Sequence, residues 1–110
     1  MEQTKMINSR QKGKVGELEL ARYLKDKGLS ARRGQQYSGS PDSPDVICED
    51  WKDIHIEVKR VEQLNIEKAL QQSTKDSGID EKPIVVHRKN REKWKVTMWL
   101  DDFIDLYTLK

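Results

Sequence analysis

The stretch SPDSPDVICEDWKDIHIEVKR, residues 40–60, decides how this chain is interpreted. DVIC, residues 45–48, and DIHIEVKR, residues 53–60, predict two strands joined by the turn EDWK. Aspartates precede the first strand and a Glu-Val-Lys sequence ends the second, so charged side chains occupy the two most strand-like segments.

The second strand presents two chemically different faces, because successive side chains of a strand point to opposite sides of the sheet. Ile54, Ile56 and Val58 share an apolar face, which we expect to pack against a helix. His55, Glu57 and Lys59 share the other face, where Glu57 and Lys59 stand roughly 6.6 Å apart. An ordinary polar outer face of an antiparallel sheet would show the same alternation.

Asp45 adds a second carboxylate at the start of the neighbouring strand. The short turn between the strands allows Asp45 and Glu57 to lie about 5 Å apart laterally. Two carboxylates this close repel unless a cation lies between them or one is protonated. Mg²⁺ prefers oxygen ligands of this kind, and Lys59 beside the pair can stabilise developing negative charge or hold an attacking water.

The rest of the chain predicts an α/β fold in which helices flank a small mixed sheet. Residues 12–27 are expected to form a helix with Val15, Leu18, Ala21 and Leu24 on its inward stripe, and Gly28 is expected to end it. We expect a short edge strand at residues 30–37 and a second helix at residues 64–77, followed by strands at 83–87 and 94–100. A terminal helix begins with Asp101 or Asp102 as N-cap. The predicted order is α-β-β-β-α-β-β-α in one domain, residues 1–110, with residues 1–10 as a loose basic lead-in.

Glu17 in the first helix shares the inward stripe of Ala21 and Leu24, where an acid is costly unless it meets a cation or a donor. An acid in the first turns of a helix is also favoured by the helix dipole, which is the alternative explanation. Glu19 lies about 160° away from Ala21 around the helix, so we expect it to be solvated.

Composition excludes several classes of protein. The single cysteine, Cys48, excludes an intramolecular disulfide and a Cys-based zinc cage. No apolar run is long enough to span a bilayer, and MEQTKMINSRQKGK is no secretory signal, so we expect a cytoplasmic protein without a membrane partner.

Charge is unevenly distributed although the net charge is only +2. Residues 5–33 hold nine cations against three acids, and residues 87–95 hold five against one, whereas residues 41–53 hold five acids and one lysine. Two basic flanks around an acidic centre suit a polyanion held at its edges, with cations bound in the middle. Ordinary mixed surface charge is the alternative. The residues expected to bind the phosphates of such a polyanion, which the resemblance given below implies is DNA, are Lys12, Lys14, Arg32, Arg33, Arg60 and Arg88.

The sequence also predicts positions for two histidines and two tryptophans. His55 is expected to be a peripheral polar contact, and His87 to touch a backbone phosphate. At least one of Trp94 and Trp99 is expected to be in the core.

Pro44-Asp45 followed by Glu57-Val58-Lys59 resembles the motif of the PD-(D/E)xK nuclease superfamily, which has the restriction-endonuclease-like fold. Asp42, preceded by Pro41, offers a second match, but Asp45 is preferred because it abuts the apolar strand. A G-x-x-x-E-L helix containing Glu17 is similar to that of archaeal-type Holliday junction resolvases, and the resemblance runs from about Gly13 to Val96. Small phage nucleases are also similar.

The resemblance implies a metal-dependent DNA endonuclease that is an intracellular protein of bacterial or phage type. Glu17, Asp45, Glu57 and the Val58 carbonyl would hold Mg²⁺, for which Mn²⁺ can substitute, and Lys59 would complete the catalytic set. Ser43 (or Ser40) and Gln71 (or Gln72) are candidates for further positions of the family pattern.

The DNA substrate would be branched or duplex, and symmetric cutting of two strands implies a homodimer, with Met98 and Phe103 in the core or at the subunit interface. A flap, nick or single-strand nuclease and a non-catalytic DNA-binding subunit are the alternatives.

Overall fold

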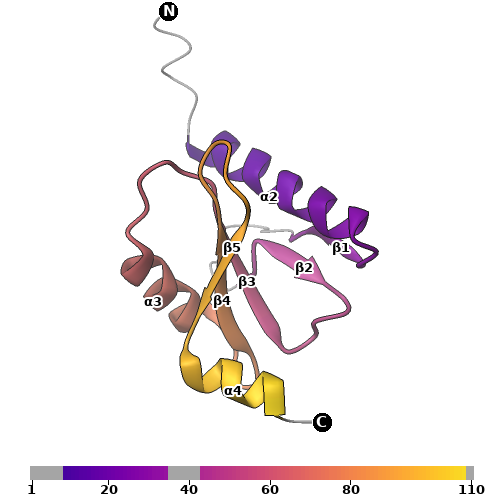
Figure 1. Ribbon diagram of the computed structural model, residues 1–110, viewed down its shortest axis with the longest axis vertical. Helices are drawn as coiled ribbons and strands as arrows, with labels where there is room; N and C mark the ends of the chain where they lie inside the picture. Colours follow the sequence, from indigo (N-terminus) through magenta and orange to yellow (C-terminus); the bar gives the residue numbers. More distant parts are fainter. Residues whose placement is uncertain (1–8, 35–42, 109–110) are drawn as a thin grey trace, which may run out of the picture.

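The chain folds around one five-stranded sheet, and the computed structural model describes residues 9–34 and 43–108. The first half comprises α2 (Ser9–Asp26), β1 (Ala31–Arg33), β2 (Val46–Cys48) and β3 (Ile54–Lys59). The second half comprises α3 (Ile66–Asp76), β4 (Lys82–His87), β5 (Lys95–Met98) and α4 (Leu100–Thr108) (Figure 1). This order confirms the predicted α/β architecture with a mixed sheet flanked by helices.

The strands follow the chain order β1-β2-β3-β4-β5 across the sheet. Neighbouring strands are antiparallel except for β3 and β4, which run parallel and are connected through α3. The parallel register pairs Glu57 with Val85 and Lys59 with His87. The end of β3 that carries Glu57 and Lys59 therefore lies beside the basic segment that follows β4.

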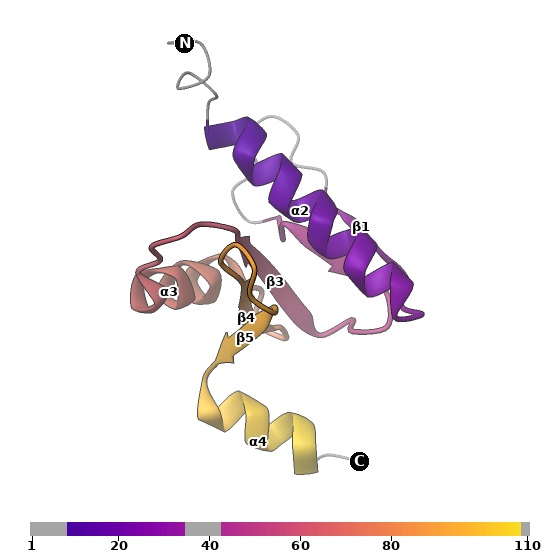
Figure 2. The ribbon, with the colours of Figure 1, turned by 45° about the horizontal axis from the view of Figure 1, so that its top comes forward.

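Both faces of the central strands are covered, by different helices (Figure 2). α2 packs Leu20, Ala21 and Leu24 onto the face that carries Ile56 and Val58. α3 packs Ala69 and Leu70 against Val85 on the opposite face. Glu57 is paired with Val85 and shares its face, and so does His55, so the polar face of β3 lies on the α3 side.

α2 differs from its prediction in where it starts and in which residues it buries. The helix begins at Ser9, and Gly28 adopts a positive φ of 93° just after its end. Val15 and Leu18 are 65% and 47% exposed, so their predicted inward position is wrong. Leu20 takes that place and is fully buried, so the inward stripe rotates toward Glu17 and Leu20.

The two other helices are held in different ways. The Asn65 side chain caps α3 by accepting a hydrogen bond from the Lys68 amide at 3.1 Å. α4 begins at Leu100, so Asp101 and Asp102 lie in its first turn and the predicted N-cap is wrong. None of the residues of α4 is buried.

The tryptophans near β5 lie on its two sides. Trp94 is partly buried against the main core, which confirms the prediction that one of the two tryptophans would be core. Trp99, just before α4, donates its indole N–H to the Thr74 hydroxyl of α3 at 2.9 Å. Within the described ranges, no helix is long and apolar enough to cross a membrane.

Candidate metal and DNA site

Asp45 is held by hydrogen bonds against β3, the strand that carries Glu57. Its Oδ2 accepts a hydrogen bond from the Val58 amide at 2.9 Å, and its own amide donates to the Ile56 carbonyl at 2.9 Å. Val46, the next residue, pairs with Ile56. The Asp45 carboxylate is therefore buried and held beside the Glu57–Val58 peptide.

Gly34 allows the chain to pass close behind Asp45. The Gly34 amide donates to the Asp45 carbonyl at 2.8 Å, and a Cβ at position 34 would lie 2.1 Å from the Pro44 carbonyl oxygen. Only glycine fits so close to the Pro44 carbonyl, because a backbone oxygen cannot move out of the way as the end of a flexible side chain could.

Glu57 is a buried acid whose ionisation is strongly disfavoured. Only 12% of its side chain is exposed. Burial first, and then the charge of Asp45, raise the pKa of Glu57 to about 7, although nearby Lys59 acts to lower it. A cation placed at this carboxylate would favour its charged form, so the pocket is suited to a positively charged ligand.

Glu17, on α2, is close enough to Asp45 and Lys59 for their charges to act on it. Burial and then Asp45 raise the pKa of Glu17, while Arg33 and Lys59 act in the opposite direction. Arg33 donates from Nε to Glu17 Oε1 at 2.7 Å. The predicted inward position of Glu17 thus agrees with the structure, and its charge partner in this arrangement is an arginine.

The donor set has the chemistry of a magnesium site. Carboxylates of Glu17, Asp45 and Glu57 and the Val58 carbonyl are hard oxygen ligands, of which Mg²⁺ needs one or two with water completing its shell. The described residues contain no group of three or more His, Cys, Asp or Glu side chains that could hold a metal ion. The acidic residues therefore fit Mg²⁺ by the chemistry of their oxygen donors, and not by an arrangement of three side chains around one point.

His55 does not have its predicted peripheral position. It is fully buried, with Nδ1 3.4 Å from Glu81 Oε1 and Nε2 3.9 Å from Glu57 Oε1. The prediction failed because α3 and the residues around β4 cover the face that an isolated hairpin would leave open.

Glu19 is also misplaced by the sequence prediction. It is partly buried and accepts hydrogen bonds from Arg60, at 2.8 Å, and from Arg88. Burial acts to raise the pKa of Glu19, but the hydrogen bonds from Arg88 and Arg60 outweigh it and lower the pKa. Two of the expected DNA-binding arginines are therefore joined to α2 through Glu19. Gly16 permits this approach, since a Cβ there would lie 2.8 Å from the Arg60 Cβ.

The other predicted site residues are spread more widely. Lys14 is exposed on α2, and Arg32 pairs with Glu49 at 2.6 Å on the surface. Ser43 is partly buried just before Asp45, and Gln71 is exposed on α3. The Lys12 side chain, Ser40 and Asp42 lie outside the described parts of the chain, so the choice between Asp42 and Asp45 rests on the position of Asp45 alone.

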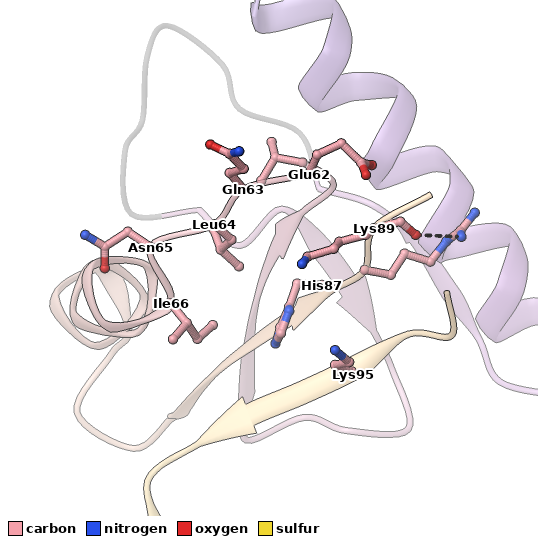
Figure 3. A pocket seen from close by; sticks show the side chains of 10 residues that line it. Glu62, Gln63, Leu64, Asn65, Ile66, His87, Lys89 and Lys95 are labelled. Atoms are coloured by element: carbon pink, nitrogen blue, oxygen red, sulfur yellow. Dashed lines mark hydrogen bonds between the residues drawn. The ribbon is translucent and has the colours of Figure 1, made fainter. Parts of the chain in front are cut away.

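A basic cavity lies at the end of β4, and two of its lysines were not predicted as DNA contacts from the sequence (Figure 3). The cavity, of about 500 Å³, lies between residues 61–66 and the β4–β5 segment, and Lys89 and Lys95 line it. His87 also lines it, but burial and then Lys95 lower the pKa of His87, which makes it a neutral polar contact at neutral pH. The parallel pairing of Lys59 with His87 brings the two parts together, and sequence alone did not predict that register.

The fold has a counterpart among proteins of known structure. It resembles that of a Holliday junction resolvase. The resolvase comes from an archaeal hyperthermophile, Archaeoglobus fulgidus. Its solved structure matches with a TM-score of 0.57 and 23% sequence identity, over 79% of this chain and 72% of that one. No protein-family model matches the sequence, and neither does any curated protein sequence. The likeness to this resolvase therefore supports the α/β architecture, whose elements follow the order predicted from the sequence.

Proposed function

We propose that the chain is a metal-dependent DNA endonuclease of the PD-(D/E)xK type that acts on branched DNA, as a Holliday junction resolvase does. The observation that carries the proposal is the closeness of Glu57 to Asp45, Lys59 and Glu17: the charges of Asp45 and Glu17 raise the pKa of Glu57, and that of Lys59 lowers it. The fold shared with a resolvase supports the same conclusion.

Each residue has a distinct part in the proposed reaction. Glu17, Asp45, Glu57 and the Val58 carbonyl would hold Mg²⁺ or Mn²⁺, and the Val58 amide, which donates to Asp45, would orient that carboxylate for this purpose. A bound ion of this kind supplies positive charge to the scissile phosphate and acidifies the attacking water. Lys59 orients that water or neutralises charge that develops on the phosphate oxygens.

DNA contacts lie on both sides of this pocket in the proposal. Lys14 and Arg32 are exposed on one side, and Lys89 and Lys95 surround the basic cavity beside Lys59 on the other. Contacts of lysine and arginine with phosphate carry no sequence information, so binding is expected to depend on DNA shape and to weaken steeply with salt. Two symmetric cuts require two such pockets, so the active form is a homodimer.

A substrate panel tests the proposal and separates it from the related nuclease activities. Labelled four-way junctions, flaps, nicked duplexes, single strands and linear duplexes are incubated with Mg²⁺, with Mn²⁺ and with a chelator. Preferential, metal-dependent nicking of opposite strands in the four-way junction is expected. Preferred cutting of flaps or single strands would agree with the proposed metal-dependent cleavage but contradict the four-way junction as the substrate.

One observation favours a second candidate function, a non-catalytic DNA-binding subunit. Glu17 is paired with Arg33, so one acid of the pocket already has a positively charged partner. If every substrate stays intact with either metal ion while junction binding persists, this second function replaces the first.

A further inference from the structure

The C-terminal helix exposes its most apolar side. Leu100, Phe103, Ile104 and Tyr107 follow one another at the i, i+3, i+4, i+7 spacing that places them on one side of α4. We call these four residues the apolar stripe. Each of them is between 45% and 72% exposed, and the Phe103 and Tyr107 rings stack at a centroid distance of 6.0 Å. A surface helix normally turns such residues toward a core, so this orientation requires an explanation.

α4 is only loosely attached to its own chain. It contains nine residues and buries none of them. Leu106, on another side of the helix, lines an apolar cavity of about 400 Å³ together with Trp51, Ile54 and Met98. Isolated helices shorter than roughly 12 residues are marginal in water, so α4 depends on packing for its stability. The packing that the chain itself provides leaves the apolar stripe uncovered.

We propose that the apolar stripe is the interface through which two copies of this chain form a twofold dimer. The inference deepens the proposed function and rests on it in one respect, namely that symmetric cutting of two strands needs two chains. In a twofold interface the same patch meets itself, so an apolar stripe supplies its own complement.

The area of the exposed apolar side chains matches what a dimer requires. With whole large side chains at roughly 150–250 Å², the exposed fractions of the four side chains of the stripe add up to roughly 450–500 Å². A standard interface buries about 800 Å² per partner, of which about 65% is apolar in homodimers. The apolar part of such an interface is thus about 500 Å² per chain, which matches the area that the stripe presents.

Charge argues against the other classes of partner. Asp101, Asp102 and Asp105 lie on α4, and residues 96–108 contain no lysine or arginine. DNA phosphates would be repelled, and helices that lie on membrane surfaces carry cations on their polar side. A protein surface is therefore the favoured occupant.

The position of α4 leaves the acidic pocket accessible. Lys59 pairs with His87, which pairs with Lys95, whereas Met98 at the other end of β5 pairs with Ile84. α4 follows Met98, so it lies at the end of the sheet remote from Lys59. Both ribbon views show α4 at the end of the β4–β5 pair away from the turn that joins these strands (Figures 1 and 2). Dimerisation through α4 would keep both pockets open to DNA.

Sedimentation velocity of the full chain over a range of micromolar concentrations tests the inference. The unaltered protein should be a dimer, and Phe103→Glu should raise its dimer dissociation constant by at least about 100-fold, as for a residue at the centre of an interface. Glutamate suits the early turns of a helix, so the monomer should retain its fold, which circular dichroism checks. Tyr107→Glu serves as a second variant, and Ile79→Glu, at a 99% exposed site outside the stripe, is the matched control.

The outcomes separate this inference from the proposed nuclease activity. A dimer that Phe103→Glu and Tyr107→Glu dissociate and Ile79→Glu does not supports the interface, whether or not the protein cuts DNA. An unaltered protein that stays monomeric overturns the inference even if it cleaves junctions. A dimer that survives both stripe variants places the interface elsewhere and overturns it as well.

Discussion

Glu57→Gln is expected to stabilise the protein at alkaline pH while removing a metal ligand. The pKa of Glu57 is raised from 4.5 to about 7 by burial and by Asp45, with smaller contributions from Asp76 and Glu17, and Lys59 opposes them. Between these two values the native state holds a proton that the unfolded chain has released. Stability therefore falls as the pH rises from about 4.5 to about 7, and the full cost is present above that window.

The size of the effect follows from the two pKa values. A tenfold change in proton affinity corresponds to about 1.4 kcal/mol, so the charged Glu57 costs the native state about 3 kcal/mol above pH 7. Glutamine has nearly the same shape and carries no charge. Glu57→Gln should therefore match the unaltered protein near pH 4 and exceed its free energy of unfolding by about 2–3 kcal/mol near pH 8.

Urea unfolding in a chelating buffer, measured across this pH range, provides the assay. The exposed Glu67 of α3 is the matched control, and Glu67→Gln should leave the pH dependence unchanged. Added Mg²⁺ should then stabilise the unaltered protein near pH 8 more than the Glu57→Gln variant, because binding to the native state adds to its stability. If the stability difference between Glu57→Gln and the unaltered protein is the same at both ends of the pH range, the reasoning about this pocket is refuted.

Two further predictions concern the support of the site and its DNA contacts. Gly34→Ala should destabilise the protein by about 1–3 kcal/mol in urea unfolding, because its Cβ would overlap the Pro44 carbonyl, and a variant as stable as the original would contradict that close approach. Lys89→Ala and Lys95→Ala should each lower the slope of log affinity against log salt for junction DNA by about one, with exposed Lys75→Ala as control, and unchanged slopes would remove the basic cavity from the DNA path.

Local pattern was sufficient for the order of the elements and for the sides of β3 and α2 on which the acids lie. Alternation of apolar and polar residues in β3 placed Glu57 and Lys59 on one face, and Asp45 abuts β2 as its sequence context indicated. Helical spacing placed Glu17 inward toward the sheet. These predictions rest on the periods of strands and helices, which the chain carries locally.

Long-range contacts account for the errors. Glu19 was expected to be solvated because its partners, Arg60 and Arg88, are 41 and 69 residues away in the sequence. His55 was expected at the periphery because nothing local shows that α3 would cover its face of the sheet. Lys89 and Lys95 were missed because only the parallel register of β3 and β4 brings their segment beside Lys59.

Single-turnover cleavage of a labelled four-way junction by Lys59→Ala tests the central claim most directly, with junction affinity measured in parallel. The variant should cut at least about 100-fold more slowly with Mg²⁺, because the charge that stabilises the reacting phosphate is lost, while its affinity stays close to that of the unaltered protein. Lys52→Ala, on the exposed turn between β2 and β3, should cut normally. Normal cleavage by Lys59→Ala would contradict the assignment of this pocket as the nuclease site.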